Sequence, residues 1–388
     1  MTRRKRTTLI VSLTVAALLI AVGVAYAAGA FPDVDPSDVH AADIQWAADN
    51  GVVNGYTNGN FGPYDNITRG QAASMFKNYD DFANQGAADG TAGCKECHND
   101  TTLITGKQAT WAESNHGENE SFVRATSAGC AGCHSGGAFS KMIAAGQNPS
   151  TVSAGDPDPT RQGCRACHQI HETGTGADWA LETTAAVALF AAPGETFDGG
   201  KGNLCANCHQ PRRTFPAPNA DGIITGISTH WGPHHGPQSA TLLGTAGAAA
   251  DGGTLDGSPM FHYTGVADTC VGCHTPAVRS HLFGADLSVC KTCHPGAENF
   301  DINGVQTETQ TRLDALAKLL AAEGLLELED PAATSNIDGH PAVTEAPENQ
   351  AVALYNWLYI AHEDKSKGVH NPAYTKAMLD AAFEALGQ

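Results

Sequence analysis

The pattern of apolar and polar positions predicts regular helices at the two ends of the chain and little regular structure between them. After Glu308 the leucines fall at the spacing of one helix face, at positions 313, 316, 319, 320 and 325. A second helix is expected over residues 348–360. A third is expected to have Asn371 as its N-cap and Pro372 in its first turn, and to end before Gly387.

Near the N-terminus, residues 31–79 contain no cysteine and predict a helix, a glycine-rich turn and a second helix. Thr68 is the predicted N-cap of the second helix, where Gln71 completes a capping box. The residues expected on the apolar face of the first helix are Val39, Ile44, Trp46 and Ala47.

The middle of the chain is rich in glycine and proline, shows little strand-like alternation and holds all twelve cysteines. Every cysteine belongs to a Cys-x-x-Cys-His unit, and no cysteine is left over. The six units are Cys94, Cys97 and His98; Cys130, Cys133 and His134; Cys164, Cys167 and His168; Cys205, Cys208 and His209; Cys270, Cys273 and His274; and Cys290, Cys293 and His294. Their uneven spacing does not fit a tandem repeat.

This five-residue unit is the attachment site of c-type haem. Its two thiols add to the vinyl groups of one porphyrin, and the histidine binds the iron from one face. Two alternatives are a disulfide framework, which is common in exported cysteine-rich chains, and zinc sites, which also use Cys-x-x-Cys pairs. Neither alternative requires a histidine directly after the second cysteine in every unit. The sequence therefore predicts six covalently bound haem c groups containing iron.

Residues 1–27 have the form of an export signal. Arg3, Arg4, Lys5 and Arg6 precede an uncharged run, and Ala25-Tyr26-Ala27 has the small-x-small form of a signal peptidase site. The run is also long enough to span a bilayer, so an uncleaved anchor is the alternative. In both cases the cysteines are expected outside the cytoplasm, where c-type haem is joined to protein.

The rest of the chain is strongly acidic. Without residues 1–27, which carry four of the 22 Lys and Arg, the formal charge is 18 − 41 = −23. This charge argues against nucleic acid and anionic lipid as partners. Much of the apolar fraction is alanine, and 43 Gly and 19 Pro indicate irregular backbone, so the core is expected to be thin. Six porphyrins would supply the missing apolar surface.

Residues 31–79 resemble an S-layer homology (SLH) module. The matching residues are Phe31-Pro32-Asp33-Val34, Trp46, Gly51-Val52-Val53, Gly55-Tyr56, Phe61, Pro63 and Ile67-Thr68-Arg69. The resemblance implies a cell-wall module over residues 28–83, in which Arg69 binds an acidic wall polysaccharide. Such modules usually occur as three copies and this chain has one. The alternative is a small helical cap with a solvated Arg69.

The second axial ligand of each iron decides whether a haem can bind a substrate, because an enzyme leaves one haem face open. Eleven histidines lie outside the six units: His40, His116, His171, His230, His234, His235, His262, His281, His340, His362 and His370. They are enough to close every iron.

The haem region resembles the multihaem family that includes the c552-type nitrite reductases. The matching phrases include Trp111-x-x-Ser114-x-His116, Cys-x-x-Cys-His-x-x-His at 164–171, His235-Gly-Pro-Gln238, Ser258-x-x-x-His262, His281-x-Phe283 and Asp364-x-Ser366-x-Gly-Val-His370. The resemblance implies distal ligands at His116, His171, His235, His262, His281 and His370, with His234 as the alternative to His235. His171 follows His168 by three residues, a span of about 10 Å at most, so it is expected to serve a different haem.

We expect a mainly α and irregular fold organised by haem, with a linker over 84–93, a haem region over 94–306 and a C-terminal helical segment over 307–388. The predicted function is electron transfer at the cell surface. Its partners are other redox proteins or extracellular acceptors, together with a secondary cell-wall polysaccharide. One alternative is a reductase of nitrite, hydroxylamine or sulfite, although all six units have His where the catalytic haem of nitrite reductases commonly has Lys. Another is a subunit of a cytochrome filament.

Overall fold

A computed structural model describes residues 31–85, 102–173, 176–234, 236–255, 257–275 and 280–388. The described residues belong to two compact units. One unit contains residues 31–85, and the other contains residues 102–173 and 177–388. The predicted export signal and the linker over 84–93, apart from its first two residues, lie outside the described residues. No helix of the described part is long and apolar enough to cross a membrane.

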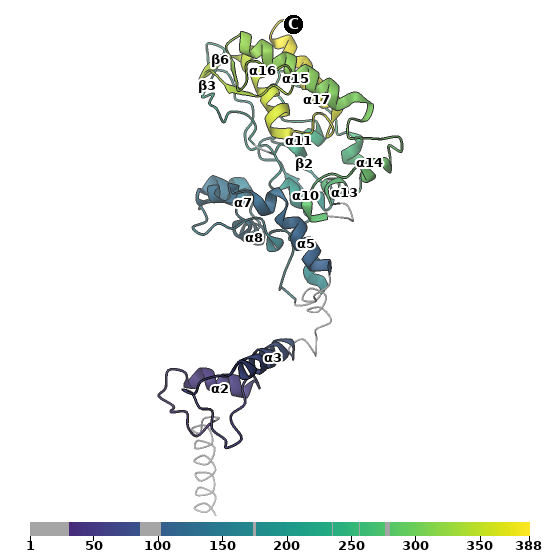
Figure 1. The fold of residues 1–388 in the computed structure, drawn as a ribbon. Coiled ribbons are helices and arrows are strands. Elements are labelled where there is room, and N and C mark those ends of the chain that lie inside the picture. The colour runs from purple at the N-terminus through teal and green to yellow at the C-terminus, as the bar shows by residue number, and fades with distance from the viewer. Residues whose placement is uncertain (1–30, 86–101, 174–175, 235, 256, 276–279) are drawn as a thin grey trace, which may run out of the picture. The chain divides into compact units, whose positions relative to one another are not determined.

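The N-terminal unit has the predicted helix, turn and helix, as α2 (Ala41–Asp49) and α3 (Arg69–Gln85) (Figure 1). The predicted capping box is confirmed. The Gln71 N–H donates to Thr68 Oγ1 at 3.2 Å, and the Thr68 N–H donates to Gln71 Oε1 at 2.8 Å. The bonds satisfy two backbone donors near the helix start, and Arg69 is the first residue of α3.

The predicted apolar face of the first helix is partly wrong. Ile44 is buried, but Val39 lies before the start of α2 and is 86% exposed, and Trp46 is half-exposed. The loops of the unit are held instead by Asp33, whose carboxylate accepts hydrogen bonds from the N–H groups of Phe61 and Gly62, both at 2.8 Å. These backbone hydrogen bonds lower the pKa of Asp33. Polar contacts, rather than a deep core, therefore organise this unit.

The larger unit is mainly helical, as predicted, and most of its helices are short. The helices before residue 300 are α5 (Thr102–Ala112), α6 (Asn115–Glu118), α7 (Ala128–His134), α8 (Gly136–Ala144), α9 (Cys164–Cys167), α10 (Gly202–Ala206), α11 (Gln238–Leu243), α12 (Phe261–Thr264), α13 (Cys270–His274) and α14 (Leu287–Lys291). Five 3₁₀ segments cover Ser121–Thr126, Pro149–Thr151, Gly176–Trp179, Ser280–Leu282 and Ile302–Gly304. Helices this short are not stable alone and depend on what they pack against.

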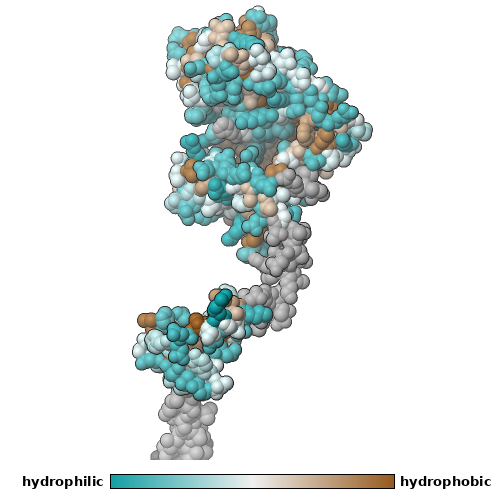
Figure 2. Space-filling view, viewed as in Figure 1, coloured by the Kyte–Doolittle hydropathy of each residue, from teal (hydrophilic) through white to brown (hydrophobic). Residues whose placement is uncertain are grey.

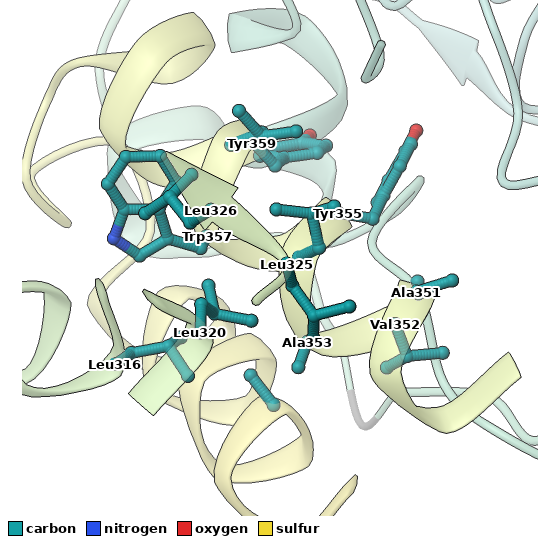
Figure 3. Packing of buried hydrophobic residues seen from close by; sticks show 14 of the residues in the cluster. Leu316, Leu320, Leu325, Leu326, Ala351, Val352, Ala353, Tyr355, Trp357 and Tyr359 are labelled. Carbon is teal, nitrogen blue, oxygen red and sulfur yellow. The ribbon is translucent and has the colours of Figure 1, made fainter. Parts of the chain in front are cut away.

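The C-terminal segment contains the three predicted helices, α15 (Val305–Ala322), α16 (Glu348–Leu358) and α17 (Pro372–Ala385). Asn371 is the N-cap of α17, as predicted, and its side chain accepts a hydrogen bond from the Tyr374 N–H at 3.1 Å. A π-helical turn, Tyr359–Asp364, extends α16. Figure 3 shows leucines from α15 and β4 lying against Tyr355 and Trp357 of α16. Together with residues from α17, they form the main hydrophobic core.

Three two-stranded antiparallel sheets complete the larger unit, and their pairs are β1 (Val187–Ala188) with β2 (Thr196–Phe197), β3 (Ile223–Thr225) with β6 (Glu345–Pro347), and β4 (Leu326–Leu328) with β5 (Gly339–Pro341). The β3–β6 pair joins the predicted haem region to the C-terminal segment. Asn356 makes a second connection, since its side chain accepts from the Ala248 N–H at 2.8 Å and donates to the Ala248 carbonyl at 2.9 Å. The C-terminal segment is thus packed directly against the cysteine-bearing part.

Candidate metal centres

Each of the five described Cys-x-x-Cys-His units lies on or at the end of one short helical turn. The turn places the two cysteines, three positions apart, on one side of the backbone. The same turn carries the histidine, whose N–H donates to the carbonyl of the first cysteine, as in His168 to Cys164 at 2.9 Å and His209 to Cys205 at 2.8 Å. Cys94, Cys97 and His98 lie outside the described residues.

The cysteines are free thiols. None of the ten cysteines in the described part of the chain forms a disulfide, although several thiols lie close together. Both thiols of each described unit are thus available for thioether bonds to a porphyrin.

The histidine of every described unit faces a second imidazole from a distant part of the chain. The centres of the facing rings are 6.2–6.4 Å apart in all five cases. The pairs are His134 with His234, His168 with His281, His209 with His116, His274 with His370, and His294 with His262. One separation of ring centres is thus repeated five times by segments of different sequence, while the angle between the rings varies from 29° to 82°.

This separation fits a metal ion between two axial imidazoles. A ring nitrogen lies about 2 Å from a bound first-row metal and about 1 Å from its own ring centre, so two rings on opposite sides have centres about 6 Å apart. A facing pair would supply two ligands, so a cofactor such as a porphyrin would have to supply the others. Among the described residues, no group of three or more His, Cys, Asp and Glu side chains could hold a metal ion.

The hydrogen bonds of these rings point to the same role. Nδ1 carries the hydrogen bond in six of the ten rings, with partners 2.8–3.2 Å away. These rings belong to His168, His209, His262, His274, His281 and His370. A partner on Nδ1 fixes the tautomer and leaves Nε2 for a metal. The residues therefore fit a haem iron held by two histidines.

A sixth pair of neighbouring histidines differs from these five in its sequence context and in the partners of its Nε2 atoms. The ring centres of His340 and His362 are 6.0 Å apart, but neither residue belongs to a Cys-x-x-Cys-His unit. Their Nε2 atoms are already paired with carboxylates, Glu329 at 3.0 Å and Asp338 at 2.6 Å. These contacts are made to exposed carboxylates, and neither histidine was predicted to be a ligand.

Four of the predicted distal ligands, His116, His262, His281 and His370, thus lie opposite a unit histidine. The imidazole opposite His134 belongs to His234, the alternative to His235; His235 itself lies outside the described residues. The His171 N–H donates to Asp178 Oδ2 at 3.0 Å, and the ring opposite His168 belongs to His281. The expectation that His171 serves a different haem stays a prediction.

Burial keeps two of the facing imidazoles neutral. Desolvation lowers the pKa of His116 to about 4, with a smaller contribution from His209 nearby. Desolvation also lowers the pKa of His281 to about 4. Neutral imidazole is the form that binds a metal, so both rings are in the ligand form at neutral pH.

The attachment sites adjoin one another. The thiols of Cys133 and Cys208 share a hydrogen bond that lowers the pKa of Cys133. A similar bond with Cys205 lowers the pKa of Cys270 to about 7. The unit of α10 therefore lies between the units of α7 and α13, although these belong to distant parts of the sequence.

Phe283 is a functional candidate that the sequence analysis named only as part of a motif. Its ring lies against two facing imidazoles, His116 at 4.9 Å and His281 at 5.7 Å between centres. Its carbonyl oxygen lies 3.0 Å from His274 Nδ1. Phe283 has a left-handed backbone with φ of 57°. A single residue thus contacts histidines of three separate pairs, which no local sequence signal indicates.

The comparisons with known proteins concern the N-terminal unit. Residues 30–73 match the S-layer homology domain, a range that covers α2, the loop after it and the first five residues of α3. This segment is an S-layer homology domain. Such domains bind secondary cell-wall polysaccharide, and the domain indicates association with the cell surface. Arg69, the predicted polymer-binding residue, is exposed at the start of α3. No curated protein and no solved structure matches the chain.

The surface of the described residues is mostly polar. Figure 2 shows hydrophilic residues over most of the face in view, with hydrophobic residues in small separate patches. Several of the exposed large apolar side chains belong to the S-layer homology domain and to α3: Val39, Trp46, Tyr56, Tyr64, Ile67, Phe76 and Tyr79.

Proposed function

We propose that the protein is an exported six-haem c-type cytochrome that transfers electrons at the cell surface, where its S-layer homology domain tethers it. The observation that carries this proposal is the set of five facing imidazole pairs, each with one histidine from a Cys-x-x-Cys-His unit. Neither zinc binding nor disulfide formation requires this repeated geometry.

In this proposal, the two cysteines of each unit fix one porphyrin and the facing histidines bind its iron from both sides. We assign the facing pairs as axial ligands, with His234 in the role predicted for His235. His171 is then the distal candidate left for the haem of Cys94, Cys97 and His98. A haem bound at these residues would supply one-electron redox chemistry at its iron.

The polypeptide fixes the order of the attachment sites and holds them close together. The contacts between thiols of α7, α10 and α13 support attachment sites that lie side by side. Since electrons pass efficiently only over short distances, adjoining sites favour conduction through the chain. The donor and acceptor are other redox proteins or an extracellular acceptor, and the acidic surface favours a basic or cationic partner.

A second imidazole opposite five unit histidines argues against a reductase, which would need an open haem face. The proposal therefore predicts that all six irons are six-coordinate and low-spin in both oxidation states, with no rapid binding of carbon monoxide or nitrite. EPR spectroscopy of the purified protein, together with carbon monoxide difference spectra, tests this. A full equivalent of high-spin haem would support the multihaem reductase of nitrite, hydroxylamine or sulfite instead.

Adjacent histidines offer a matched pair of variants for the same experiment. His234→Ala should convert one iron to a five-coordinate or water-ligated site while all six haems remain attached. His235→Ala should leave the spectra unchanged. The reverse result would assign the ligand to His235, and two silent variants would show that neither imidazole binds the iron of His134.

The tether is the second part of the proposal, and Arg69 is its predicted contact with the polysaccharide. Arg69→Ala should weaken sedimentation with cell-wall sacculi that retain their secondary polymer, because it removes a charge-assisted hydrogen bond worth about 1.5–3 kcal/mol. Lys77→Ala on the same helix serves as a control for the loss of one positive charge. Equal binding of the wild-type, Arg69→Ala and Lys77→Ala proteins would remove Arg69 from the binding site.

A further inference from the structure

The Nδ1 partner of His370 differs in charge from the partners that the structure assigns to Nδ1 of five other facing histidines. His370 Nδ1 lies 2.8 Å from Oδ1 of Asp364, a carboxylate whose side chain is only 2% exposed. In the other five rings with an assigned Nδ1 contact, the partner is a neutral oxygen. These oxygens are the carbonyls of Trp179, Phe283 and Val369, the amide of Gln238 and the hydroxyl of Ser280.

Asp364 is held in place by the end of the π-helical turn. The turn ends at Asp364, and Lys365 follows in the left-handed conformation with φ of 58°. The Ser366 hydroxyl and N–H both donate to Asp364 Oδ2. The Gln238 amide donates to the backbone carbonyl of Asp364 at 3.3 Å. The carboxylate therefore points at His370 from a position fixed by several hydrogen bonds.

A carboxylate on Nδ1 changes what Nε2 offers to a metal. It attracts the Nδ1 proton, which gives the ring imidazolate character and makes Nε2 a stronger electron donor. Its buried negative charge also favours the more positively charged iron. Both effects stabilise the ferric state more than the ferrous state, and both lower the reduction potential. A backbone carbonyl in the same place would act in the same direction, but more weakly.

We propose that Asp364, acting through His370, lowers the reduction potential of the haem attached at Cys270 and Cys273 relative to a site with a neutral partner. This inference rests on the proposed function, since it requires a haem between His274 and His370. Asp364 is a positioning residue that tunes this one site. The reduction potentials of the haems along the chain would then differ according to which oxygen accepts the Nδ1 hydrogen bond of each histidine.

The test is a potentiometric titration of the purified holoprotein, followed by optical and EPR spectroscopy. Asp364→Asn keeps the shape and an oxygen acceptor but removes the charge. It should raise one of the six potentials and shift the g-values of one low-spin haem, with six haems still attached. Ser366→Ala should change the same potential in the opposite direction, because it removes a donor that withdraws charge from the carboxylate. A purely structural disturbance would not give opposite signs.

Asp314→Asn is the matched control. Asp314 is also a buried carboxylate, but it accepts from the backbone N–H groups of Asn336 and Ile337 and contacts no imidazole. Its variant should leave all six potentials in place. Unchanged potentials in haem-loaded Asp364→Asn, or a change to high-spin iron in that variant, would overturn the inference alone. A Cys270 to Cys273 peptide without haem would overturn the proposed function as well.

Discussion

The C-terminal helical segment and the cysteine-bearing region before it are built in different ways. Ten of the twelve largest fully buried side chains of the described chain lie between residues 316 and 379, among them Trp357, Tyr355 and Leu316. The region from 102 to 300 contributes only Phe197 and Ile224 to that set. Its own two buried apolar clusters are small, with eight and four buried residues.

This difference shows where each region obtains its apolar core. Helices of four or five residues, such as α9 and α10, cannot be stable without large surfaces to pack against. In the proposed function, a porphyrin would supply such a surface and covalent thioether bonds would hold it in place. The C-terminal segment instead packs long helices around its own aromatic and leucine side chains. We infer that the first region depends on its haems, whereas the second does not.

The largest difference between the two regions is expected when the chain is produced without haem attachment. With its thiols kept reduced, the haem-free protein should be cleaved by proteases within residues 102–212 at least about tenfold faster than within α15–α17, a difference of about 1.4 kcal/mol in opening free energy. Mass spectrometry of a short digestion locates the cuts. The haem-loaded protein is the control, and it should resist cleavage in both regions. Equal protection of the two regions without haem would contradict the comparison.

Trp357→Ala should have a smaller effect, and it should destabilise the C-terminal segment rather than the haem region. Trp357 is fully buried, and its Nε1–H donates to the Leu313 carbonyl at 3.1 Å. Its loss should cost about 3–5 kcal/mol of unfolding free energy, measured by denaturant titration with circular dichroism. The variant should keep all six haems. Trp46→Ala, at a half-exposed tryptophan, should change the unfolding free energy by about 0.5 kcal/mol or less. A loss as small as this in Trp357→Ala would show that α16 does not carry the core.

Local signals in the sequence predicted local structure well. The Thr68 capping box, the Asn371 N-cap and the three C-terminal helices are all present, because each depends on residues a few positions apart. The prediction failed for Val39, where an apolar residue of suitable spacing lies outside the helix and faces solvent. Periodicity alone does not fix where a helix begins.

The pairing of histidines could be predicted only in part. Motif resemblance selected His116, His262, His281 and His370 as candidates, but it did not say which unit each would face. Such pairs join residues far apart in sequence, as His116 and His209 do, and so depend on the whole fold. Neighbouring His234 and His235 have the same chemistry and cannot be told apart by composition or spacing.

The residues that support the pairs were the least predictable. Phe283 matters because three histidines from distant segments converge on it, and Asp364 because its carboxylate meets His370 inside the fold. Their residue types are common in any sequence. Only the three-dimensional arrangement distinguishes Phe283 from an ordinary apolar residue, or Asp364 from an ordinary acidic one.

The central claim, that the cysteine-bearing region is built around six haems, is tested most directly by the intact mass of the protein purified from an exporting host that attaches c-type haem. The account predicts the mass of the polypeptide plus six haems, with every Cys-x-x-Cys-His peptide carrying one haem through two thioether bonds. The mass of the polypeptide alone, or a mass lowered by disulfide formation, would contradict it.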